Sequence, residues 1–315
     1  MMRWRRSRCN FFMTLEKRTV VEEIPPHIVN SINETLQSYP HIKEIIPQCH
    51  SRTILQFDQY KGEIPLYLKD EIAESNIYGV LQYSARSRRF SFQLSLLDSL
   101  LSKYPEYRDN LNFRSQLVDS FFSRLLEIEM YDFLKERGYS PDIEPLIMPE
   151  NKNSTKADFK ISVKGIDIFL ELFTPRLPLK EALDFMRKSN TLELDGKPNA
   201  FFYEPTGDNN VINKLYEEYK HHFQKFEPQF HSPSLIILDK TYSIGLADIF
   251  EESNLKSIFE KFQFPNYFIG IYDRTNYHID TISKVLREPK PCRFYINPKY
   301  VDSLSLIPAL NKLFC

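Results

Sequence analysis

An alternation of apolar and polar positions runs through the middle of the chain, from Lys156 to Phe173. The apolar positions form two rows, Phe159, Ile161 and Val163 in the first and Ile166, Ile168, Leu170 and Leu172 in the second. Because strand side chains point to opposite faces in turn, the rows predict two strands joined by a tight turn at Lys164-Gly165. The same period places Asp158 and Glu171 on the polar sides of these strands. Two carboxylates can therefore meet at one edge of a small sheet.

Other segments follow either the helical or the strand period. Helical spacing of apolar residues predicts helices at residues 28–36, 92–101, 114–137, 179–187, 211–226 and 244–262. The third of these ends at Gly138, and glycine is typical of a helix C-terminus. Short apolar runs predict strands at residues 53–57, 78–83, 143–148, 234–239, 267–272 and 293–297.

Strands and helices that alternate in this way predict an α/β fold with a mixed central sheet flanked by helices. We expect two parts in the chain of 315 residues. Residues 1–110 form an α-rich N-terminal region to which no role can be assigned, and residues 111–315 form the α/β domain. An insertion rich in proline interrupts this domain at about residues 174–208, and it is either a functional flap or a surface insertion.

Composition and charge narrow the function. The chain is 42% hydrophobic and 26% charged, as in a globular protein, and no run of about 18 apolar residues predicts a membrane span. Neither GxGxxG nor GKS/T occurs, which argues against a dinucleotide or P-loop nucleotide site. Because the formal net charge is −1, any basic surface for nucleic acid must be local. The arginine clusters at residues 3–8 and 86–89 are interpreted as solvated surface.

The four cysteines have no metal-like spacing, and Cys49-His50 lacks the second half of a zinc site. They predict free thiols in a reducing compartment, and hence a cytoplasmic protein. Residues 1–12 are too short and too polar for a secretory signal.

The order of helix, strand, carboxylate hairpin, helix and strand resembles the core of the PD-(D/E)XK nuclease superfamily. The resemblance covers about residues 113–298. Residues 122–139 are similar to the first core helix of that superfamily, in which a Glu faces the active site and a Gly closes the helix. Ala157-Asp158-Phe159 stands where the Pro-Asp element would be, and Leu170-Glu171-Leu172-Phe173 stands where the (D/E)-x-K element would be. The resemblance implies a restriction-endonuclease-like core.

Two glutamates compete for the role on the first core helix. Counted back from Gly138, the family pattern favours Glu127. A helical wheel instead places Glu129 on the apolar arc and Glu127 nearly opposite. We therefore expect Glu127 to be the catalytic glutamate and keep Glu129 as the alternative.

Phe173 stands at the place of the superfamily's lysine, which is the more serious of two departures from the motif. Because related proteins supply this lysine from other positions, we expect Lys220, on the helix after the hairpin, to replace it. Lys160, which shares the polar side of its strand with Asp158, and Lys214 are the alternatives.

The resemblance implies Mg²⁺ or Mn²⁺ held by Asp158 and Glu171, with Glu127 and Lys220 assisting hydrolysis of DNA phosphodiester bonds. A homodimer is a further expectation, because nucleases of this type often act on both strands of a duplex. The alternative hypothesis is a catalytically inactive nuclease-fold module that binds nucleic acid or a protein partner. Phe173 and the near-zero net charge favour that alternative.

Four further polar residues are expected to be structural or exposed to solvent. Asp239, which follows a buried run, is interpreted as a strand-end cap, and Asp167, beside the turn, is expected to face solvent. His221 and His222 are adjacent on a predicted helix and therefore point in different directions, so both are interpreted as surface residues.

Overall fold

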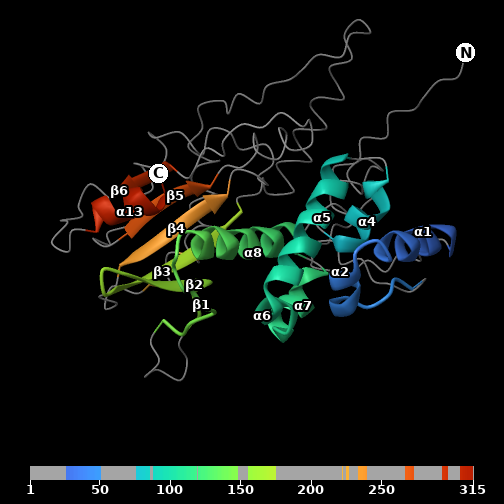
Figure 1. Cartoon of the computed structure of the whole chain (residues 1–315), viewed down its shortest axis with the longest axis horizontal. Coiled ribbons are helices and arrows are strands. Elements are labelled where there is room, and N and C mark those ends of the chain that lie inside the picture. Colours follow the sequence, from blue (N-terminus) through green and yellow to red (C-terminus); the bar gives the residue numbers. More distant parts are fainter. Residues whose placement is uncertain are drawn as a thin grey trace, which may run out of the picture. The chain divides into compact units, whose positions relative to one another are not determined.

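The computed structural model of the chain describes residues 26–50, 76–85, 88–118, 120–147, 155–174, 222, 225–226, 233–239, 267–272, 293–296 and 306–314. The chain divides into two units, Met1–Leu125 and Leu126–Cys315 (Figure 1). The division therefore falls inside a helix, later in the sequence than residue 110. The predicted helices at residues 179–187 and 244–262 and the predicted strand at residues 53–57 lie outside the described residues.

Helices alone make up the regular structure described in the first unit. They are α1 (Pro26–Leu36), α2 (Pro40–Ile45), α4 (Ile77–Ser84), α5 (Arg88–Lys103), α6 (Pro105–Arg108) and α7 (Leu111–Leu117). Helix α5 buries Leu94, Leu97 and Leu101, which recur at the spacing of one helix face. The predicted helices at residues 28–36 and 92–101 are confirmed.

The predicted strand at residues 78–83 is wrong, because this segment is helix α4. Ile77, Val80 and Leu81 are fully buried, and their spacing of three and four residues is that of a helix. The side chain of Asn76 accepts a hydrogen bond of 2.9 Å from the backbone N–H of Tyr78, as an N-cap residue does. A short apolar run fits both the helical and the strand period, so Asn76 in front of it was the better indication of a helix.

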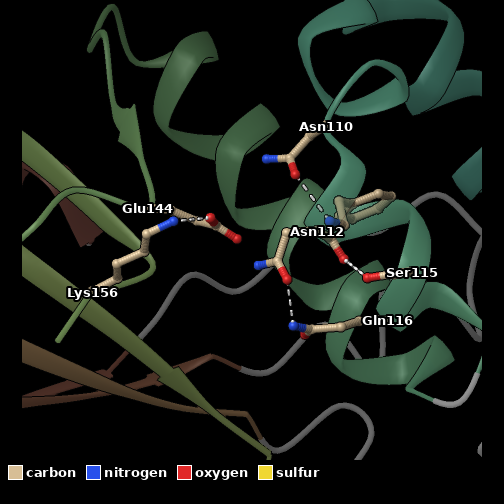
Figure 2. Close-up of polar contacts among 7 residues, drawn as sticks. Asn110, Asn112, Ser115, Gln116, Glu144 and Lys156 are labelled. Carbon is tan, nitrogen blue, oxygen red and sulfur yellow. Dashed lines mark hydrogen bonds and ion pairs between the residues drawn. The ribbon is translucent and has the colours of Figure 1, made fainter.

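The single helix predicted at residues 114–137 is two helices, α7 and α8 (Phe121–Glu136). Asn110 caps α7 by accepting a hydrogen bond of 3.0 Å from the N–H of Phe113 (Figure 2). Helix α8 ends as expected at Gly138, whose φ is +81°. The N–H of Tyr139 bonds back to the carbonyl of Leu134 at 3.1 Å, which closes the last turn.

The second unit contains a six-stranded mixed sheet, as the sequence predicted for its type (Figure 1). In spatial order the strands are β1 (Asp142–Ile143), β2 (Phe159–Val163), β3 (Ile166–Phe173), β4 (Ser234–Asp239), β5 (Tyr267–Tyr272) and β6 (Arg293–Ile296). Strand β3 pairs with β4, and β4 with β5, in parallel, whereas the other neighbours are antiparallel. A C-terminal helix that was not predicted, α13 (Ile307–Phe314), buries Leu310 and Leu313.

Helix α8 lies against one face of this sheet. The ring centroids of Tyr131 and Phe159 are 6.1 Å apart, and those of Phe133 and Tyr272 are 6.2 Å apart. The strand register places Phe159 and Tyr272 on the same face, because strand residues alternate between faces. By the same register Glu171 belongs to the opposite face. No helix in the described ranges is both long and apolar enough to cross a membrane.

Candidate active site

The hairpin of β2 and β3 fixes the register of the two predicted acids. Val163 pairs with Ile166, so the turn consists of Lys164 and Gly165, which have φ angles of +52° and +78°. Positive φ at both positions is the geometry of a type I′ turn, which suits the twist of the adjoining strands. The pairing of the two strands ends with Phe159 opposite Leu170, so Asp158 directly precedes the last pair in β2 and Glu171 directly follows it in β3.

Asp158 accepts a backbone hydrogen bond from β3 with its side chain. Its backbone N–H donates to the carbonyl of Leu170 at 3.1 Å, as a strand residue would. Its carbonyl accepts from the N–H of Glu144 at 3.0 Å, which continues the pairing of β1 with β2, and its carboxylate Oδ2 accepts from the N–H of Leu172 at 2.6 Å. The carboxylate of Asp158 therefore lies beside the peptide bond that follows Glu171. The structure thus brings the two predicted acids together.

Glu144 supports this end of the hairpin from β1. It has a φ of +50°, which turns the chain so that its N–H reaches the carbonyl of Asp158. Its carboxylate forms an ion pair of 2.9 Å with the ammonium of Lys156, two residues before Asp158 in the chain (Figure 2). The polypeptide around Asp158 is therefore held on two sides.

Glu171 is the buried acid of the pair, with only 2% of its side chain exposed. Its Oε1 atom lies 2.8 Å from Nδ1 of His222 and also forms an ion pair with the ammonium of Lys225. Its Oε2 atom is buried and accepts no hydrogen bond from the part of the chain that the structure describes. A buried carboxylate oxygen without a donor is costly, and a cation is one of the groups that satisfies it.

The partners of Glu171 form the accessible side of the site. His222 and Lys225 expose 27% and 31% of their side chains, and the ring of His222 stacks on Phe173 with centroids 4.4 Å apart. His222 was expected to be a surface residue; it is partly exposed, but it also contacts Glu171 and Phe173. Its neighbour His221 lies outside the described residues.

Lys225 was not among the lysines expected near the site. Of those that were, Lys220 and Lys214 lie outside the described residues, so the choice of Lys220 stays a prediction. The ammonium of Lys160 lies 3.0 Å from Asp142 and 3.6 Å from Asp167. Lys160 therefore pairs with an acid of β1 and with an acid at the end of β3 next to the turn, and not with Asp158 or Glu171. Asp167 is half-exposed, as expected, but it is paired.

Both candidate glutamates of α8 are buried, Glu127 at 2% exposure and Glu129 at 1%. Residues four apart on a helix lie on the same side. Glu127 therefore shares a side with Tyr131, which contacts β2, and Glu129 shares a side with Phe133, which contacts β5. Glu127 is therefore on the side of α8 that meets β2, which Asp158 directly precedes. Because α8 lies on the face opposite Glu171, the choice of Glu127 stays a prediction.

Asp239 is fully buried at the end of β4 and accepts a hydrogen bond of 3.3 Å from the hydroxyl of Thr174, which follows β3. The bond ties together the ends of two parallel strands. This contact agrees with the interpretation of Asp239 as a strand-end cap.

Mg²⁺ is commonly held in phosphoryl-transfer sites by one or two carboxylates, with water and phosphate oxygens as its other ligands. Asp158 and the orphaned oxygen of Glu171 meet this requirement. The described residues contain no cluster of three or more His, Cys, Asp or Glu side chains arranged to hold a metal. Two carboxylates would leave most positions around such an ion to water or phosphate oxygens.

The described part of the first unit contains an open polar hollow of about 510 Å³. Its lining consists of Ser38, Tyr39, His41, Ser95, Asp98, Ser99, Ser102 and Lys103. Asp98 accepts hydrogen bonds from the backbone N–H groups of His41 at 2.9 Å and Ile42 at 3.0 Å. It therefore satisfies the free donors at the start of α2 and joins that helix to α5. The position of the Asp98 carboxylate in this hollow is therefore explained by its structural role.

No family model, curated protein or solved structure matches the chain.

Proposed function

We propose that this protein hydrolyses phosphodiester bonds in DNA with the help of Mg²⁺ or Mn²⁺. The observation that carries the proposal is the convergence of Asp158, Glu171 and Lys225 at the start of a β hairpin. Two carboxylates from neighbouring strands, with a lysine ammonium at one of them, are the groups that the resemblance to the PD-(D/E)XK superfamily calls for. In this proposal Lys225 has the role that was expected of Lys220.

Asp158 and Glu171 would hold the metal ion, and a bound ion supplies an activated water and neutralises phosphate charge. Lys225 would place its positive charge where negative charge develops on the phosphate oxygens. Its ammonium already stands at Oε1 of Glu171, so the other oxygen, Oε2, remains for the cation. The partial exposure of Lys225 leaves room for a phosphate beside it.

One observation favours the second candidate, a nuclease-fold module that binds nucleic acid or protein without cleaving. Each acid already has a partner within the protein, since Leu172 donates to Asp158 and both His222 and Lys225 contact Glu171. A site compensated in this way is stable without a metal ion. A module that has lost its chemistry could keep such contacts for stability alone.

A cleavage assay separates the two candidates. Purified protein is incubated with supercoiled plasmid and Mg²⁺ or Mn²⁺, beside Asp158→Ala and Glu171→Gln variants. The proposal predicts nicking by the wild type, none without metal, and none by either variant. A parallel reaction with single-stranded RNA determines whether DNA is the preferred substrate.

The matched control for these variants is Asp167→Asn, which removes a half-exposed carboxylate from the same strand. It should nick plasmid at the wild-type rate. A wild type that neither cleaves nor binds Mn²⁺ in calorimetry would overturn the enzymatic proposal. Binding of DNA by such a protein would then support the second candidate.

A further inference from the structure

Phe173 occupies the position at which the superfamily motif carries its lysine, and it has a defined contact. Its ring packs against the ring of His222 in a tilted arrangement, with centroids 4.4 Å apart and an angle of 45° between the planes. Aromatic pairs at this separation are stabilising beyond the area that they bury. Phe173 is therefore an attachment point for the segment that contains His222.

His222 contacts a second residue of β3. Its Nδ1 atom is 2.8 Å from Oε1 of Glu171, and strand residues two apart lie on the same face of a sheet. One histidine therefore spans Phe173 and Glu171, with an aromatic contact to one and a polar contact to the other. These two contacts fix both the place of the ring and its rotation.

Lys225 follows His222 by only three residues in the chain. His222 is helical, Lys225 is in a turn, and both contact the same oxygen of Glu171. Once His222 is in place, the lysine is within reach of the carboxylate.

We propose that His222 is a positioning residue, which docks on Phe173 and Glu171 and thereby places the ammonium of Lys225 at the carboxylate pair. In this view Phe173 and His222 together replace the motif lysine, because they anchor a lysine supplied from another segment. The catalytic part of this inference rests on the proposed function, whereas the placement of Lys225 does not.

Two substitutions separate the contacts of His222. His222→Phe keeps a ring against Phe173 and removes the polar contact with Glu171, whereas His222→Asn keeps a polar atom near the position of Nδ1. Groups that orient a metal ligand typically change metal affinity or activity by about 10- to 100-fold when they are removed. We expect His222→Phe to weaken Mn²⁺ binding by this factor in calorimetry and His222→Asn to retain most of the affinity. Both should keep the wild-type thermal midpoint to within a few degrees.

A second measurement tests placement without metal or substrate. Acetic anhydride modifies exposed lysine amines, and mass spectrometry reports the rate at each residue. Lys225 is held by Glu171 and should react more slowly than Lys156, which is 55% exposed and serves as an internal reference. His222→Phe and Phe173→Leu should each accelerate modification of Lys225 and leave Lys156 unchanged.

The outcomes distinguish the two proposals. If the wild type neither binds Mn²⁺ nor cleaves but Lys225 still becomes reactive in the variants, the catalytic proposal fails and the placement stands. If Lys225 reacts at the wild-type rate in both His222→Phe and Phe173→Leu, His222 is not a positioning residue, whatever the activity.

Discussion

The backbone N–H of Leu172 donates a hydrogen bond of 2.6 Å to the Oδ2 atom of Asp158. In a regular antiparallel ladder this donor would bond to a backbone carbonyl of the neighbouring strand. Here the carboxylate of Asp158 is the acceptor, while its backbone carbonyl accepts from the N–H of Glu144 and so continues the pairing of β1 with β2. The carboxylate is thereby fixed next to Glu171 by the main chain of the same strand.

This contact predicts different effects for two substitutions of Asp158. Asp158→Asn keeps an oxygen for the N–H of Leu172, so its free energy of unfolding in urea should stay close to that of the wild type. Asp158→Ala leaves that donor unsatisfied and should lower the free energy of unfolding by about 1–3 kcal/mol. Both should be inactive, because neither carries the charge that holds a cation. Equal stability of the two variants would show that the hydrogen bond contributes nothing.

Lys225→Met tests the cation at Glu171. Removing one preorganised charge-stabilising group typically lowers kcat by about 10²- to 10³-fold, and we expect a loss of this size in plasmid nicking. Lys220→Met is the matched comparison, because the sequence favoured that lysine for the same role. Thermal unfolding of both proteins should accompany the assay, since Glu171 stays buried when its partner is removed. A large loss in Lys220→Met together with full activity in Lys225→Met would show that the sequence had identified the lysine.

The hairpin that holds the two acids could be predicted from the sequence because it depends on local rules. The period of two and the turn at Lys164-Gly165 together fix which residues of the hairpin face each other. The strands at Ser234–Asp239 and Tyr267–Tyr272 were also predicted with both ends correct, because each is a short apolar run. Whether these elements form the predicted restriction-endonuclease-like core stays a prediction.

The lysine at the site could not be predicted in the same way. Lys225 is 54 residues from Glu171 in sequence, so the contact depends on how one segment docks on the sheet. Helical spacing shows which residues share a side, but it does not show which side meets β3. The contact of His222 with Phe173 supplies that information, and it is seen only in the folded structure. The same limit applies to α4, whose apolar run fits a strand or a helix until its neighbours are known.

The turn between β2 and β3 predicts a backbone effect. Gly165 has a φ of +78°, and a Cβ atom added there would meet nothing within 4 Å. Gly165→Ala should therefore cost only the left-handed backbone, about 1–2 kcal/mol in the free energy of unfolding. Gly138→Ala, with a φ of +81° and equally open space, should lose a similar amount. Lys164→Asn should instead stabilise the protein, because Asn-Gly is the preferred pair in a type I′ turn. An unchanged Gly165→Ala protein would contradict the turn geometry.

The N-terminal cap of α7 predicts a separable effect in the first unit. Asn110 accepts a hydrogen bond from the N–H of Phe113, whereas Asn112 bonds to the exposed side chain of Gln116 (Figure 2). Asn110→Ala should lower the free energy of unfolding by about 1 kcal/mol. Asn112→Ala is the control and should remain within about 0.5 kcal/mol of the wild type. Chemical denaturation of the two variants decides the matter, and a reversed order would disprove the cap.

Lys160 predicts a pH-dependent contribution to stability. Its pKa is raised above the ordinary value of 10.5, chiefly by its hydrogen bond to Asp142 and further by the charges of Asp142 and Asp167, while burial acts in the opposite direction. A lysine with a raised pKa stabilises the fold fully below its unfolded pKa, and this contribution disappears as pH rises through the folded pKa. The ammonium is partly exposed, so solvent screening limits the contribution to about 1 kcal/mol or less.

The measurement compares the wild type with Lys160→Met by urea unfolding at a series of pH values. Taking the difference between the two proteins cancels the titration of all other groups. We expect the wild type to be the more stable at neutral pH and the difference to shrink only above pH 10.5, where the lysine loses its proton. A difference that vanished on the acid side of neutrality instead would show that protonation of the carboxylates, and not deprotonation of the lysine, controls the cluster. A difference that stayed constant across the alkaline range would show that Lys160 stabilises the hairpin through its aliphatic stem rather than through its charge.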